Sequence, residues 1–240
     1  MITIDENSLI RALPKWISRS GTLRASIMGV NDGLVSNFCL VMGLAGGTNN
    51  DHQMVLLAGF IGLLAGSLSM ATGEYVSVKA QRDVYEKQVQ IEKRHLAEDR
   101  NGEQVKLIKS YELQGLSKDQ AVAASEILLS NERLALETML KEEHGLSEEQ
   151  FGSPLGAASG SLIAFMLGAS IPILPYIIQQ QGSPFIVTVS LSTIFLALVG
   201  GTLSAFSGKT IWIGALRMLF AGSIAAFATY GAGSVINQFI

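Results

Sequence analysis

Charge is scarce in this chain of 240 residues, of which only 15% are charged. A soluble globular domain has roughly 25% charged residues, whereas here 48% of the residues are hydrophobic. The mean hydropathy is +0.36. This composition favours a membrane protein over a soluble enzyme, and a net charge of -3 does not indicate a nucleic-acid partner.

Cysteine is almost absent as well. The single Cys39 excludes an intrachain disulfide and any metal site built from several thiolates. Free cysteines in apolar helices are most often small packing residues. No pattern of haem or iron–sulfur ligands is present, which disfavours a membrane oxidoreductase. The N-terminal Arg11, Lys15 and Arg19 are not followed by the short apolar core of a cleavable signal peptide.

Charged residues are rare in two long stretches, and this scarcity divides the chain. Between Leu34 and Val78 the charged residues are Asp51 and Glu74, and from Gln150 to the end they are Lys209 and Arg217. The segment 79–149 between these stretches is densely charged. Transmembrane helices need about 20 mostly apolar residues. Five segments meet this requirement: about 26–46, 54–77, 155–178, 184–206 and 211–236.

The predicted fold is therefore all-α, a polytopic membrane protein with five transmembrane helices and a helical bundle inserted between the second and third. The expected division is an amphipathic N-terminal segment at 1–25, two spans at 26–78, an inserted domain at 79–152 and three spans at 153–240. Positive charges precede span one, fill the insert and return at Lys209. Because Lys and Arg stay cytoplasmic, the N-terminus and the insert are predicted inside and the C-terminus outside.

The insert is expected to be helical throughout. Nothing interrupts a helix from Val78 to about Glu98, so span two is predicted to continue as one long rod. A break is predicted at Asn101-Gly102. Ser117 with Gln120 resembles a capping box, and a further helix is expected between Asn131 and Gly145. Ser153-Pro154 should begin span three, with Pro172 and Pro175 kinking or ending it.

Small residues recur four apart in several spans, as in Gly29 with Gly33 and Gly62 with Gly66. Such pairs let helix backbones approach closely in lipid. We expect Gly29 and Gly33 to bring span one against a second copy of itself or against span two.

Asp32 carries a charge within a predicted span. Inserting such a carboxylate into the membrane costs roughly 2.5 to 3.5 kcal/mol. Measured from Arg24 and Lys79, Asp32 and Met70 lie at the same depth, with Glu74 nearer the cytoplasm. A carboxylate with a thioether suits ions such as Fe2+. Alternatively, Met70 fills a helix contact, Glu74 is merely solvated, and Asp32 is satisfied by neighbouring polar groups.

A second set of possible metal ligands lies in the insert. Glu92 and His95 share a helical face, as do Met139, Glu142 and Glu143, and Glu103 lies on the helix between. Carboxylates with an imidazole and a thioether suit a divalent transition metal. The alternative is a solvated charged face. Glu92-x-x-His95 is also half of a ferritin-like di-iron motif, but the second copy is missing.

Several motifs resemble the vacuolar iron transporter family: residues 24–36 (RASIMGVNDGLVS), 65–77 (AGSLSMATGEYVS), 142–146 (EEHGL) and the stretch from Ser153-Pro154 to Pro175. The resemblance extends over nearly the whole chain from about Ser20. It implies a five-span homodimer that moves Fe2+, and often Mn2+, out of the cytoplasm in exchange for protons, along a path between the subunits.

The resemblance also implies roles for particular residues. Asp32 and Met70 match the transmembrane metal positions, and Glu74 falls in the span-two motif. Glu92, Glu103, Met139 and Glu143 match the metal-binding positions of the insert. His95 and Lys106 stand where glutamates are expected. A protonated lysine cannot bind a metal, so this site should hold fewer metal ions, or hold them more weakly.

The expected function is that of a proton-coupled exporter of Fe2+, with Mn2+, Co2+ and Zn2+ as alternative substrates. The metal is bound as a substrate, and no prosthetic group and no enzymatic activity are expected. The expected partners are divalent metal ions, protons, the lipid bilayer and a second copy of the chain. The expected location is a bacterial inner membrane. The alternative is a membrane protein that senses or stores metal in its insert without transporting it.

Overall fold

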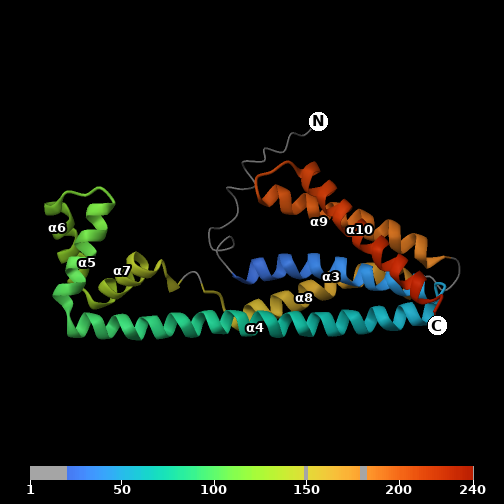
Figure 1. Ribbon diagram of the computed structural model, residues 1–240, viewed down its shortest axis with the longest axis horizontal. Helices are drawn as coiled ribbons and strands as arrows, with labels where there is room; N and C mark the ends of the chain where they lie inside the picture. The colour runs from blue at the N-terminus through green and yellow to red at the C-terminus, as the bar shows by residue number, and fades with distance from the viewer. Residues whose placement is uncertain (1–20, 149–150, 179–182, 240) are drawn as a thin grey trace. The chain divides into compact units, whose positions relative to one another are not determined.

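The computed structural model describes residues 21–148, 151–178 and 183–239, and these form helices and connecting loops without a strand (Figure 1). The expected N-terminal segment 1–25 lies mostly outside the described residues. The helices are α3 (Gly21–Gly47), α4 (His52–Glu98), α5 (Arg100–Leu113), α6 (Lys118–Leu129), α7 (Glu132–His144), α8 (Pro154–Ile178), α9 (Pro184–Phe206) and α10 (Ile211–Ile236). The all-α prediction is confirmed.

Five of these helices are long and apolar enough to cross a membrane: α3, α4, α8, α9 and α10. The five predicted spans are confirmed, and α4 continues as one helix of 47 residues, as the sequence predicts. The chain divides into two compact units. The first, called here the membrane unit, extends to Val76 and resumes at Ser153; the second, the inserted unit, is Ser77–Gly152.

Within the membrane unit, α3 lies against α8 at backbone distance (Figure 1). A side chain at Gly29 would meet the carbonyl oxygen of Ser161 at 2.8 Å, and one at Gly33 would collide with that of Phe165. On α8, a Cβ at Gly168 would likewise collide with the backbone oxygen of Val30. These glycines therefore serve the contact with span three, and the expectation that they face span two or another copy of α3 is wrong.

The helix α4 packs differently, because its glycines accept whole side chains from neighbouring helices. Gly59 lies against the side chain of Ile173, and a Cβ at Gly62 would overlap Leu40. Gly66 leaves space for the ring of Phe165. Side chains therefore separate α4 from α3 and α8, whereas α3 and α8 meet backbone to backbone.

Prolines and glycines set the ends of the spans. Pro154 opens α8 behind Ser153, whose hydroxyl accepts a hydrogen bond from the Gly156 amide at 3.2 Å, as predicted. Pro172 and Pro175 lie inside α8, which continues to Ile178 rather than ending at either. Gly208, with φ +65°, turns the chain between α9 and α10.

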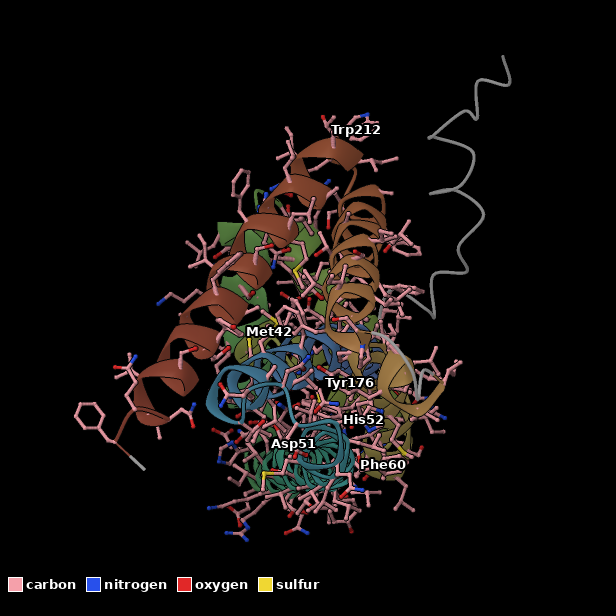
Figure 2. All side chains as sticks on the ribbon, turned by 90° about the vertical axis from the view of Figure 1, so that its right-hand side faces the viewer. Met42, Asp51, His52, Phe60, Tyr176 and Trp212 are labelled. Atoms are coloured by element: carbon pink, nitrogen blue, oxygen red, sulfur yellow. The ribbon has the colours of Figure 1, made fainter. Side chains whose placement is uncertain are left out.

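The loop between α3 and α4 is tied to the end of α8 (Figure 2). Asn49 and Asn50 have positive φ angles, which asparagine tolerates. The Tyr176 hydroxyl donates to Oδ1 of Asn50 at 2.7 Å, and its ring lies 5.6 Å from that of His52. Asp51 caps α4 by accepting a hydrogen bond from the Met54 amide. This end of the membrane unit is held by polar side chains.

The inserted unit contains three short helices, α5 to α7, beside the last turns of α4. Ser117 and Gln120 form the predicted capping box of α6. Asn131 caps the start of α7, and Gly145, with φ +64°, ends it as predicted. The predicted break at Asn101-Gly102 is wrong: the helix is interrupted at Asp99, whose side chain accepts a hydrogen bond from the Gly102 amide. Because Asp99 supplies the cap, Asn101 and Gly102 lie in the first turn of α5.

Candidate functional site

Two buried glutamates lie at the centre of the polar cluster of the inserted unit. Glu92 on α4 is 1% exposed and Glu103 on α5 is 4% exposed. One oxygen of each carboxylate, Oε2, has no hydrogen-bond partner among the described residues. Burial of a carboxylate is costly unless its oxygens are paired. These two oxygens are therefore coordination sites for a cation that no group of the described residues fills.

Two imidazoles approach the same oxygen of Glu92. Its Oε1 lies 2.9 Å from Nε2 of His144, and Nδ1 of His95 lies 3.8 Å away. The same His95 nitrogen is 3.9 Å from Oε1 of Glu103. Gln88, one turn before Glu92, places its side-chain nitrogen 2.8 Å from Nε2 of His144. The helices α4, α5 and α7 thus bring nitrogen and oxygen atoms together around one buried carboxylate.

The third glutamate of the cluster is Glu143, on α7. Ligand atoms of Glu92, Glu143 and His144 all lie within 4.8 Å of one another, a spacing that one metal ion could bridge. Of the residues predicted from sequence, Glu92, His95, Glu103 and Glu143 are therefore brought together in the structure.

Lys106 places a positive charge inside this cluster. Its ammonium group lies 2.7 Å from Oε1 of Glu103 and 3.4 Å from Oε1 of Glu143. The hydrogen bond to Glu103 raises the pKa of Lys106, so the lysine stays charged at neutral pH. Part of the carboxylate charge is therefore already neutralised by the protein itself.

Two predicted ligands have other surroundings. Met139 is fully buried and packs in an apolar cluster with Leu107, Leu129 and Ala135. Glu142 points toward α5, where its Oε2 accepts hydrogen bonds from Gln114 at 2.7 Å and Ser110 at 3.3 Å. Its Oε2 is occupied there, and the group of described ligand atoms around Glu92 consists of Glu92, Glu143 and His144 without Glu142.

His144 and Gln88 are not among the site residues predicted from the sequence. Their signals are visible in retrospect: Gln88 precedes Glu92 by one helical turn, and His144 is the last residue of α7 before its glycine cap. Neither signal shows which residue of another helix the side chain will meet. The contact between α4 and α7 decides that.

The three predicted membrane residues differ in exposure. Asp32 lies on an exposed face of α3 together with Met28 and Ser36, which are one turn away on either side. The Ser36 hydroxyl donates to the backbone oxygen of Asp32, which leaves the carboxylate itself available. Met70 is half-buried and packs against a cluster containing Leu63 and Phe165. Glu74, one turn further along α4, is also half-buried.

Five apolar spans, a carboxylate on an exposed span face and a cluster of metal-ligand atoms around a buried glutamate define a multi-pass membrane protein with a candidate metal site. Residues 23–234 match the family model described as VIT family. The chain belongs to this family.

Relatives named as vacuolar iron transporters match most of the chain. It is 32% identical over 222 residues to "Vacuolar iron transporter" of Acanthamoeba castellanii, covering 90% of this chain and 79% of the relative. It is 28% identical over 225 residues to "Vacuolar iron transporter 2" of Oryza sativa subsp. japonica, covering 93% and 91%. It is 29% identical over 225 residues to "Vacuolar iron transporter homolog 2" of Arabidopsis thaliana, covering 93% and 89%. The similarity includes both units.

Proposed function

We propose that the protein is a transporter that moves a divalent metal, Fe2+ or one of the related ions Mn2+, Co2+ and Zn2+, out of the cytoplasm in exchange for protons. The observation that carries this proposal is the pair of buried glutamates, Glu92 and Glu103, each with one oxygen, Oε2, that has no partner among the described residues. The other oxygen, Oε1, lies 3.8 Å from Nδ1 of His95 in Glu92 and 3.9 Å from it in Glu103. The names of the relatives as iron transporters support iron as the metal. The ions are substrates, and no prosthetic group or catalytic step is assigned.

In this proposal the inserted unit collects the ion from the cytoplasm and Asp32 binds it within the membrane. Asp32 must lose its proton to bind a cation, so metal and proton compete for the same carboxylate. That competition is the physical basis of exchange. Met70 supplies a thioether ligand, and Glu74 lies between these two residues and the cytoplasmic end of the spans.

The working form is proposed to be a homodimer with the path at the subunit interface. Asp32, Met28 and Ser36 lie on a face of α3 that the described part of the chain leaves uncovered. A carboxylate facing lipid is costly, whereas one facing a second subunit and a hydrated path is not. With paired copies, two Asp32 carboxylates and two Met70 thioethers would complete one site.

The proposed location is a bacterial inner membrane, with the N-terminus and the inserted unit in the cytoplasm and the C-terminus outside. The positive charges that precede α3, fill the inserted unit and include Lys209 support this orientation.

The test is transport by the purified protein in liposomes with an acidic lumen. Fe2+ should enter the vesicles while the lumen becomes more alkaline, and Asp32→Asn should abolish both signals. Asp51→Asn is the matched control, because it removes a carboxylate outside the spans and keeps a good helix cap. Transport by Asp32→Asn at the wild-type rate would contradict the mechanism. Binding of Fe2+ without any uptake by the wild type would instead identify a metal-sensing or storage protein.

A further inference from the structure

Nitrogen ligands distinguish the inserted unit from an ordinary acidic surface. Two imidazoles, His144 from α7 and His95 from α4, approach the buried Glu92 from different helices. In an octahedral shell with bonds of ~2.1 Å, neighbouring ligand atoms lie ~3 Å apart. The 2.9 Å between Nε2 of His144 and Oε1 of Glu92 fits two neighbouring ligands of one ion. The two unpaired carboxylate oxygens, on Glu92 and Glu103, remain for further bonds.

Lys106 acts on the oxygen-rich side of the same cluster. Its ammonium group lies between Glu103 and Glu143, whose oxygens would otherwise form an all-carboxylate position. A second divalent ion there would have to displace a charged lysine. The position that remains open to a metal ion is the one next to Glu92, where imidazole nitrogen is in reach.

Ligand type separates the divalent metals. Carboxylate and water suit Mg2+ and Mn2+, whereas imidazole favours later metals, and affinity for such sites rises from Mn2+ through Fe2+ and Co2+ to Ni2+. Replacing an oxygen ligand by imidazole should therefore strengthen the binding of the later ions more than that of Mn2+.

We propose that the inserted unit selects metals that prefer nitrogen, Fe2+, Co2+ and Ni2+, against Mn2+ and Mg2+, and that His144 and His95 are the selecting ligands. This inference rests on the proposed transport function, because it names the class of substrate that the same site admits. Gln88 is a positioning residue, because its side-chain amide contacts the two ligands His144 and Glu92.

The first experiment needs no variant. One equivalent of Co2+ is added to the purified full-length protein, and X-ray absorption at the cobalt edge is recorded. Scattering from imidazole rings is the expected result. A shell of oxygen atoms alone would overturn the assignment of His144 and His95 as ligands.

The second experiment measures selectivity as the ratio of the Kd for Mn2+ to the Kd for Co2+. In His144→Glu this ratio should fall at least about tenfold, the scale on which even outer-shell groups change metal affinity. His52→Glu, which changes a histidine of the membrane unit, is the control and should keep the wild-type ratio. An unchanged ratio in folded His144→Glu protein would overturn the inference.

Liposome transport then separates this inference from the proposed function. Uptake that favours Co2+ over Mn2+ in the wild type and loses the preference in His144→Glu supports both. If the wild type takes up metal but shows no imidazole scattering, His144 and His95 are not the selecting ligands, and the proposed transport function is retained. If the wild type binds Co2+ in preference to Mn2+ but takes up neither, the proposed transport function is wrong, and the assignment of His144 and His95 as selecting ligands is retained.

Discussion

Nε2 of His144 lies 2.9 Å from Oε1 of Glu92, although the two residues are 52 positions apart in the chain. Glu92 is buried on α4, and His144 is held at the end of α7 by the left-handed Gly145 that closes the helix. Two helix positions therefore fix the contact before any ion arrives. A preformed pair of this kind lowers the ordering cost of binding a metal.

Lys106→Glu should raise the number of divalent ions bound by the inserted unit by about one per chain. The change removes the ammonium group from between Glu103 and Glu143 and adds a carboxylate to the same place. Equilibrium dialysis with Mn2+, which suits oxygen ligands, measures the stoichiometry. Lys109→Glu, with the same charge change at an exposed position of α5, is the control. Equal stoichiometry in the two variants would show that Lys106 does not exclude a second ion.

Metal should protect the inserted unit against opening. A ligand that binds only the folded state at 100 times its Kd stabilises that state by about 2.7 kcal/mol, which slows exchange through global opening about 100-fold. Hydrogen exchange of the full chain, followed by mass spectrometry with and without Co2+, measures this for the amides of α5 and α7. Addition of EDTA should reverse the protection, and the amides of α9 serve as the internal control. No change in α5 and α7 would place the bound metal elsewhere.

Gly33→Ala should destabilise the membrane unit by about 1 to 3 kcal/mol, the usual cost of overpacking. Its new methyl group would collide with the backbone oxygen of Phe165, and backbone atoms of a packed helix cannot move aside easily. Gly231→Ala is the matched control, because a Cβ there meets nothing within 4 Å. Thermal unfolding in the same detergent should show a lower midpoint for the first variant alone. Equal midpoints would mean that α3 and α8 separate easily.

The elements of the fold that could be predicted from sequence are those set by local signals. Long apolar runs bounded by Pro154, Pro184 and Gly208 predict the spans, because chain length and turn chemistry suffice. The capping box at Ser117 predicts the start of α6 for the same reason. The predicted break at Asn101-Gly102 lies two residues beyond the observed one, because glycine is read as the helix breaker whereas Asp99 provides the N-cap of α5.

Contacts between helices could not be predicted in this way. Helical spacing puts Glu142 and Glu143 on one side of α7 but does not tell which of them will accept a hydrogen bond from Ser110 of α5. Likewise, the spacing of Gly29 and Gly33 predicts a close helix contact but does not name α8 as the partner. Such choices depend on the packing of whole helices rather than on local sequence.

The two kinds of helix contact in the membrane unit differ in how they resist sliding. Between α3 and α8, backbone meets backbone at Gly33 and Gly168, so a shift of one residue would drive a side chain into a carbonyl. Against α4, the contacts are side chains such as Leu40 and Phe165 seated over glycines, and side chains can change rotamer. The helix that carries Asp32 is therefore held in register with α8, and a relative movement of helices within the membrane unit would meet least resistance at the side-chain contacts of α4.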